Sequence, residues 1–139
     1  MFDSWEYQIA ANTSEANRVT HPCKISPGII RDVRVFFPLG CNGLARCRVF
    51  KGQAPIAPQS SGSYITGDGL DVGATDIYEP TEGNMPELTW EIWNVDDTYA
   101  HTLTLKAAWV TEEELMVERG LLAAILNRID ALVRALGGG

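Results

Sequence analysis

Apolar and polar residues alternate with a period of two over much of this chain. In residues 87–94, for example, Leu88, Trp90 and Ile92 are separated by polar side chains. A period of two buries one face of a strand and leaves the other in water, as in half-buried antiparallel strands. The same alternation runs through residues 29–37, 44–51 and 101–110.

Shorter apolar segments and explicit turns complete this pattern. Residues 6–10, 18–25, 63–65 and 76–78 are further candidate strands. Ser26-Pro27-Gly28 and Pro38-Leu39-Gly40 are predicted turns, because proline presets φ and glycine accepts a positive φ. About eight strands with no helix between them predict a mainly β fold, an antiparallel β-sandwich or jelly-roll-like domain over residues 1–110.

The period changes after Trp109, and residues 111–139 are predicted to form a C-terminal amphipathic α-helix with a glycine tail. Thr111 and Glu114 have the spacing of a capping box, and Gly137 to Gly139 end the helix near residue 136. Apart from Glu118, the first and fourth positions of each heptad are apolar: Leu115, Leu122, Ile125, Ile129, Leu132 and Leu136.

This apolar stripe has two interpretations. It packs back on its own sandwich, or it pairs with copies of itself or another protein, because a 3.5-residue spacing suits a seam between helices. Leu121, Leu126 and Val133 widen the stripe beyond a two-helix seam, which favours either packing on its own domain or a trimer. We expect the six heptad residues to be interface residues of a homo-oligomer, a dimer or trimer.

Composition narrows the choice of partner. The chain has 45% hydrophobic and 21% charged residues, an ordinary globular balance. A net charge of −7 argues against nucleic acid or an anionic membrane as the partner. No apolar run approaches the ~20 residues of a membrane span, and the first residues lack a signal-peptide pattern, so we expect synthesis in the cytoplasm.

The charges are unevenly distributed along the chain. Residues 1–51 carry seven basic and four acidic side chains, whereas residues 52–105 carry nine acidic and no basic ones. The two sets form solvated faces of one domain, or a basic patch of one copy meets an acidic patch of its neighbour. In the second case the candidate interface residues are Arg31, Arg34, Arg46 and Arg48.

The sequence predicts no catalytic, cofactor or metal site, so we expect a protein that is not an enzyme. Three cysteines, Cys23, Cys41 and Cys47, without zinc-site spacing favour reduced, partly buried thiols. Residues 68–76 carry three aspartates, but Leu70 stands where a calcium loop needs an oxygen donor, which favours an acidic turn. Phosphate-binding, nucleophile-elbow and zinc-protease motifs are absent from the sequence.

Aromatic residues suggest one alternative function. Trp5, Tyr7, Trp90, Trp93 and Trp109 are candidates for a platform that stacks on a sugar ring. The alternation instead assigns Trp90 and Trp109 to the core. Trp93 is three residues from Trp90, so it is predicted to face the opposite side of the strand. A carbohydrate-binding module is therefore a second hypothesis.

Residues 24–50 and 88–105 carry strand and turn signatures that resemble small β-rich proteins encoded in bacteriophage or prophage structural gene clusters. The resemblance covers about residues 5–110 and excludes the helix. It implies a structural virion protein, such as a capsid decoration or cement protein, that binds the major capsid or another virion protein and neighbouring copies. The alternative is a carbohydrate-binding or tail- or head-fibre adhesion module. We expect the virion as its location.

Overall fold

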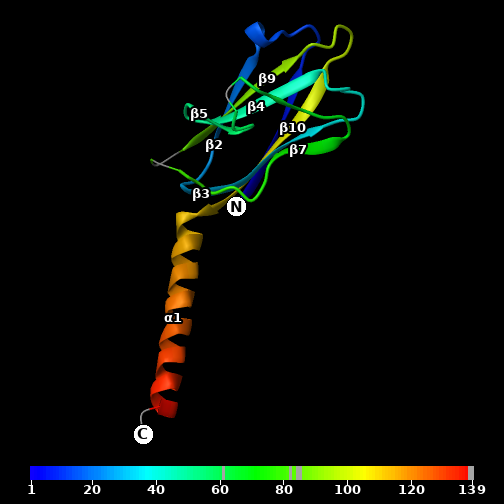
Figure 1. Cartoon of the computed structure of the whole chain (residues 1–139). Helices are drawn as coiled ribbons and strands as arrows, with labels where there is room; N and C mark the ends of the chain where they lie inside the picture. Colours follow the sequence, from blue (N-terminus) through cyan, green and yellow to red (C-terminus); the bar gives the residue numbers. More distant parts are fainter. Residues whose placement is uncertain (61, 82, 84–85, 138–139) are drawn as a thin grey trace.

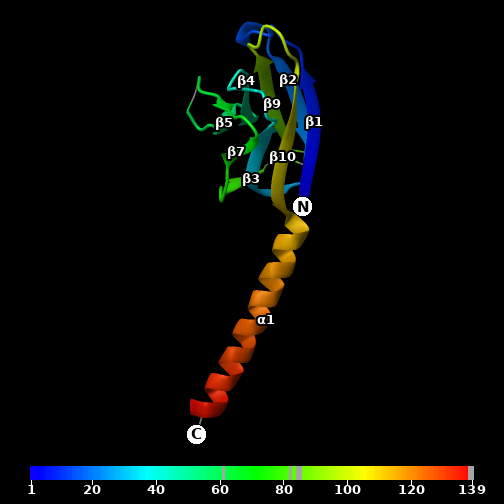
Figure 2. The ribbon, with the colours of Figure 1, turned by 90° about the vertical axis from the view of Figure 1, so that its right-hand side faces the viewer.

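The computed structural model describes residues 1–60, 62–81, 83 and 86–137. It consists of two packed antiparallel β-sheets and one long helix that projects from one end of them (Figures 1 and 2). The predicted class, a β-sandwich followed by a C-terminal helix, is therefore confirmed.

Each sheet has five strands. The first has the order β1 (Phe2–Ile9), β10 (His101–Thr111), β3 (Gly28–Phe37) and β7 (Leu70–Ala74), and β8 (Glu79–Pro80) also pairs with β3. The second has the order β2 (Val19–Lys24), β9 (Glu87–Asn94), β4 (Ala45–Lys51) and β5 (Ala54–Ala57), and β6 (Ile65–Thr66) also pairs with β4. A short 3₁₀ helix, η1 (Glu15–Asn17), precedes β2.

The strand order is that of a jelly roll. β1 pairs with β10 and β2 with β9, so segments from opposite ends of the β-rich region lie side by side in both sheets. Most successive strands alternate between the two sheets, which is the double Greek-key arrangement. Because β10 runs the length of the domain, its last residue, Thr111, and the loop before His101 lie at opposite ends.

The core lies between the sheets and is formed by the residues that the alternation predicted to face inward. These side chains are buried, and none exceeds the 5% exposure of Trp109: Val33, Val35, Phe37, Ala45, Cys47, Val49, Leu88, Trp90, Ile92, Leu103, Leu105, Ala107 and Trp109. A register shift between Ala108 and Trp109 marks a β-bulge just before the helix.

Several details differ from the sequence-based prediction. β1 begins at Phe2 rather than at residue 6, and β6 is Ile65–Thr66 rather than residues 63–65. Residues 76–78 are not a strand; Asp76 has a φ of 54°, which breaks an extended chain. β5 was not predicted, because Pro55 interrupts its pattern, and β7 lies in the segment interpreted as an acidic turn. β7 forms because its backbone pairs with β3, even though it contains Asp71 and Gly73.

Candidate assembly interface

The helix α1 (Glu112–Gly137) begins directly where β10 ends, with no linker between them. The predicted capping box is present. The Glu114 amide donates to Thr111 Oγ1 at 3.2 Å, and the Thr111 amide donates to Glu114 Oε2 at 3.4 Å. The Glu112 amide also donates to the Pro27 carbonyl oxygen at 3.0 Å, which ties the first turn to the β2–β3 loop. Of the expected glycine tail, Gly137 is the last residue of the helix, and Gly138 and Gly139 lie outside the described residues.

Beyond its first turn, α1 leaves the sandwich. None of its 26 residues, all described by the structure, is buried, and only Leu115 is half-buried. Figures 1 and 2, two perpendicular views, show the helix extending away from both sheets. At 1.5 Å per residue it is about 39 Å long. The interpretation in which the stripe packs on its own domain is therefore wrong.

The exposed helix carries a continuous apolar surface. Exposed fractions of the five remaining heptad residues range from 48% for Ile125 to 87% for Leu136. Leu121, Leu126 and Val133 lie beside them and are similarly exposed. In proteins most helical stability comes from packing of the apolar face. A contiguous exposed stripe of this kind is a candidate interaction surface.

Comparison with known proteins finds no match: no family model, no curated protein and no solved structure matches this chain. Among the described residues, no helix is long and apolar enough to cross a membrane. The described residues also contain no group of three or more histidine, cysteine or carboxylate side chains placed to hold a metal ion.

The structure does not bring the four candidate arginines together. Arg31 and Arg34 are on β3, whereas Arg46 and Arg48 are on β4 in the other sheet. Since the neighbours of Arg34 and Arg48 along each strand point into the core, the two guanidinium groups lie on opposite outer faces. An interface role for these arginines stays a prediction. It now concerns two separate surfaces, one on each sheet.

Most of these arginines already have contacts within the chain. Arg34 pairs with Asp32 at 2.8 Å, and the Arg46 guanidinium lies 4.6 Å from the centre of the Tyr64 ring. Similar pairs join the basic first part of the chain to the acidic second part, such as Lys51 with Glu79 at 3.1 Å. The uneven charge along the chain is therefore partly neutralised inside one molecule.

A network that the sequence did not reveal lies on the outer face of the second sheet. Arg48 donates to Glu91 at 2.7 Å and to Glu15 at 2.9 Å, and Arg18 donates to Glu91 at 2.9 Å. Burial acts to raise the pKa of Glu91, but the hydrogen bonds from Arg18 and Arg48 outweigh it and leave this pKa below its ordinary value. Glu91, on β9, is thus held as a carboxylate between Arg48 of β4 and Arg18, which lies between η1 and β2, and Arg48 extends the network to Glu15 of η1.

The aromatic residues do not form an exposed platform. Trp90 and Trp109 are in the core, as predicted, and Trp5 is half-buried. Trp93 points outward from the core but is fully covered: the Arg48 guanidinium lies 5.1 Å from its ring centre, and Tyr64 packs edge-on at 5.6 Å. Tyr7 is also half-buried and lies 5.4 Å from the His21 ring, and both Trp5 and Tyr7 pack against the core. The five rings therefore do not gather into one exposed surface.

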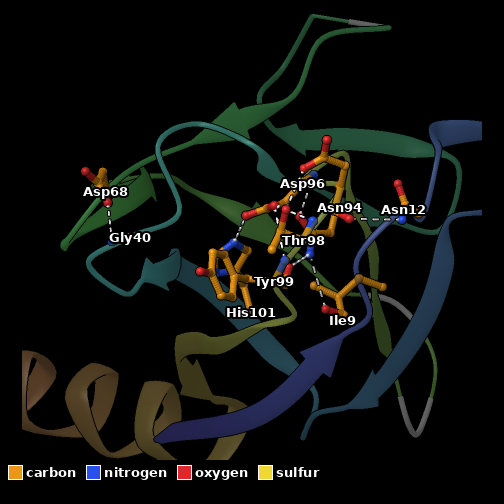
Figure 3. A network of polar contacts seen from close by, with 10 residues as sticks. Ile9, Asn12, Gly40, Asp68, Asn94, Asp96, Thr98, Tyr99 and His101 are labelled. Atoms are coloured by element: carbon orange, nitrogen blue, oxygen red, sulfur yellow. Dashed lines mark hydrogen bonds and ion pairs between the residues drawn. The ribbon is translucent and has the colours of Figure 1, made fainter.

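A polar network fixes the end of the sandwich opposite the helix (Figure 3). Asp96 accepts hydrogen bonds from the amides of Thr98 and Tyr99 and from His101 Nε2, the last at 2.8 Å. Asn94, fully buried, donates to the carbonyl oxygens of Ile9 and Tyr99. These contacts hold the β9–β10 loop against β1. The loop sequence Asn94-Val95-Asp96-Asp97-Thr98 is typical of a turn, but it does not predict the contact with β1.

Asp96 is ionised within this network. The backbone hydrogen bond from Thr98, the side-chain bond from His101 and the backbone bond from Tyr99 lower the pKa of Asp96 below its ordinary value. Both side chains of the Asp96–His101 pair are only 9% exposed, and their hydrogen-bond partners belong to the chain itself. The pair therefore serves as a structural tie in this loop.

The cysteines and the aspartate-rich segment do not form sites. All three cysteines are free and buried, and burial raises the pKa of Cys23 and of Cys41 to about 11. Burial also raises the pKa of Cys47. In the segment considered for calcium, Asp68 accepts from the Gly40 amide at 2.7 Å, whereas Asp71 pairs with Lys106 at 2.9 Å. Their partners lie in different elements, so these carboxylates do not converge.

Proposed function

We propose that this chain is a structural protein of a bacteriophage virion, a capsid decoration or cement protein that binds the shell and neighbouring copies. The observation that carries the proposal is the protruding helix with its uncovered apolar stripe. A subunit of this design acts by contact between chains, and it requires no cofactor or catalytic group.

The β-domain suits such a role. Jelly rolls occur in viral capsid and lectin domains, and their two packed sheets give a rigid body that presents loops at both ends. Fold alone does not define function, so the proposal depends on the helix. The resemblance of residues 24–50 and 88–105 to proteins of phage structural clusters points to the virion as the assembly.

The first test is whether the chain is part of a particle. Phage particles are induced from the source strain, banded in a density gradient and analysed by quantitative mass spectrometry. We expect the chain in the particle band at a fixed ratio to the major capsid protein. A chain that is made during induction but remains in the soluble fraction would contradict the proposal.

The second test asks whether the helix contributes to incorporation. The double substitution Ile125→Asp with Ile129→Asp places two charges in the stripe, and we expect it to lower incorporation at least tenfold. Joined copies bind a repetitive surface more tightly than single copies. The control, Asn127→Asp with Ala131→Asp, adds acidic side chains at the same spacing on the other side of the helix and should leave incorporation unchanged.

A second candidate function, adhesion by a head or tail fibre, is favoured by one observation. Tyr99 is 67% exposed, and it lies in the loop that Asp96 and Asn94 fix at the end away from the helix. An exposed aromatic ring on a fixed loop can stack on a sugar. Binding to a glycan array that is lost in Tyr99→Ala would support this function, and no binding across the array would exclude it.

A further inference from the structure

We propose that the partner of the helix stripe is the same helix in two other copies, and that the three helices run parallel and in register. This inference rests on the proposed function only in using the helix as the assembly element. It adds the identity, the number and the direction of the partners, each of which follows from a different feature of α1.

The identity follows from the periodicity. With Leu115 as the first position (a) of a heptad, the a positions are all apolar, and the fourth positions (d) are Glu118, Ile125 and Leu132. Such a 3.5-residue repeat fits a second helix that carries the same repeat, because the side chains of each helix enter the spaces of the other. Since α1 contributes no buried residue to its own domain and only Leu115 is half-buried, the seam beyond Leu115 is free for this contact.

The number follows from the width of the stripe. A two-helix seam buries mainly the a and d positions, with charged residues beside them at positions e and g. Here Leu126 and Val133 occupy e positions and Leu121 a g position, and each is more than half exposed. A third helix covers these flanks. Leu122 at a with Ile125 at d disfavours two strands, whereas Ile129 at a with Leu132 at d has the two-strand pattern, so the number of chains is argued from the width of the stripe.

The direction follows from the charges. In a parallel pair, a g residue lies next to the e residue five positions later in the other helix. Glu114 at g and Arg119 at e have this spacing, so each interface places these opposite charges side by side, while Glu114 also caps its own helix through the Thr111 amide. The next such pair, Leu121 with Leu126, is apolar on both sides.

Glu118 does not distinguish the two directions. At a d position it faces the seam, and in a parallel bundle Arg119 of the neighbouring helix lies beside it. In an antiparallel bundle, where a positions meet d positions, Glu118 lies level with Ile129 and next to Arg128 of the neighbour. Either arrangement offers this carboxylate a cation, so the direction is argued from the pair of Glu114 and Arg119.

A parallel bundle places the three jelly rolls together at one end. Each helix starts directly from β10, so the heads surround the start of the bundle and the opposite loops, with Tyr99, point away from it. A groove between the start of the helix and the head is lined by the apolar and aromatic side chains of Ile29, Tyr78, Leu115 and Met116 and by the charged residues Glu112 and Arg119.

Disulfide trapping tests direction and register in the full-length protein. Leu136→Cys puts a thiol at the last a position, and Leu115→Cys puts one at the first. The three natural cysteines are buried and do not compete under native conditions. In a parallel bundle, Leu136→Cys chains cross-link to one another on mild oxidation. When this variant is mixed with Leu115→Cys and reassembled, mixed disulfides stay at background.

A control cysteine variant and the mass of the assembly in solution complete the test. Asn127→Cys, on the outer side of the helix, should cross-link at least tenfold more slowly than Leu136→Cys. Light scattering of the wild-type chain should give three times 15.2 kDa, about 46 kDa. Predominant mixed disulfides would overturn the parallel arrangement, and a monomeric, dimeric or tetrameric mass would overturn the three-chain bundle.

Failure here is distinguishable from failure of the proposed function. A chain that is monomeric in solution but present in particles overturns this inference and leaves the virion role standing. A parallel trimer that is absent from particles supports this inference and removes the virion role.

Discussion

At the residue scale, Asp96 joins the loop between β9 and β10 to the start of β10. It accepts from two backbone amides and from His101, and the residues around it contact β1 through Asn94. Three strands therefore depend on one small polar cluster. Such a cluster stabilises a fold only while all of its members keep their partners.

This cluster predicts a pH-dependent effect of Asp96→Asn. The pKa of Asp96 is lower in the folded chain than its ordinary value of 3.8, so its carboxylate stabilises the fold above about pH 4. That contribution is lost as the pH falls through the folded pKa. We expect the variant to have a lower Tm at pH 7, with the difference shrinking towards pH 3, in thermal unfolding followed by circular dichroism. The neighbouring Asp97→Asn is the control, and an equal Tm difference at both pH values would contradict the prediction.

We predict that the three cysteines react slowly with thiol reagents in the native protein. Cys23, Cys41 and Cys47 are at most 2% exposed, and burial raises their pKa values, so few thiolates are present at pH 8. We expect reaction with a thiol reagent at least a hundredfold slower in the native protein than in 6 M guanidinium chloride. Rapid labelling of one cysteine without denaturant would show that the described packing opens locally.

At the scale of elements, alternation predicted most of the long strands well and the short ones poorly; the exception among the long strands is β1, which begins at Phe2 rather than at the predicted residue 6. β9 lies within the predicted bounds, and β3, β4 and β10 differ from theirs by one residue, because each has several alternating pairs. β5, β7 and β8 have too few residues for a period to be visible, and proline or aspartate interrupts them. Their pairing is decided by the neighbouring strand, which local sequence does not encode.

The helix illustrates a second limit. Its start, capping box and apolar stripe were all predictable, because each depends on residues within a few positions of one another. Whether the stripe packs on its own sandwich depends on the direction in which β10 ends. That direction is set by the sheet and by the bulge at Ala108 and Trp109, not by the helix sequence.

The helix bundle predicts a stabilising substitution. Glu118 is the polar exception in the seam, and Glu118→Leu should strengthen assembly by about 2 kcal/mol per chain, the effect of burying one leucine side chain. Sedimentation of a dilution series should show dissociation at a lower concentration than for wild type. Asn127→Leu, on the outer side, is the matched control. Weaker assembly of Glu118→Leu would indicate that Glu118 makes a favourable contact that leucine cannot replace.

At the scale of the whole molecule, the sandwich and the helix are energetically separate. The core is built from strand and loop residues before residue 110, and α1 adds no buried residue to it. The helix contacts the rest of the chain mainly through its first turn, where Glu112 bonds to Pro27 and Glu114 lies 3.5 Å from the N-terminal amine.

This separation predicts that residues 1–111 fold without the helix. We expect the fragment 1–111 to unfold cooperatively on heating. Its Tm should lie within a few degrees of the Tm of the β-domain in the full-length double variant Ile125→Asp with Ile129→Asp. That variant keeps the helix but places charges in the stripe, so it separates loss of the helix from loss of assembly. An unfolded or aggregated fragment would show that the first turn of α1 is needed to complete the sandwich.

The direct junction between β10 and α1 also sets the rotational phase of the stripe. With no linker, and with the first turn bonded to the β2–β3 loop, the face of the helix that looks outward is fixed relative to the two sheets. Each residue added or removed at the junction would turn that face by about 100° around the helix axis. A one-residue change beside Thr111 would therefore leave the strands and the heptads intact and yet aim the stripe at a different side of the head.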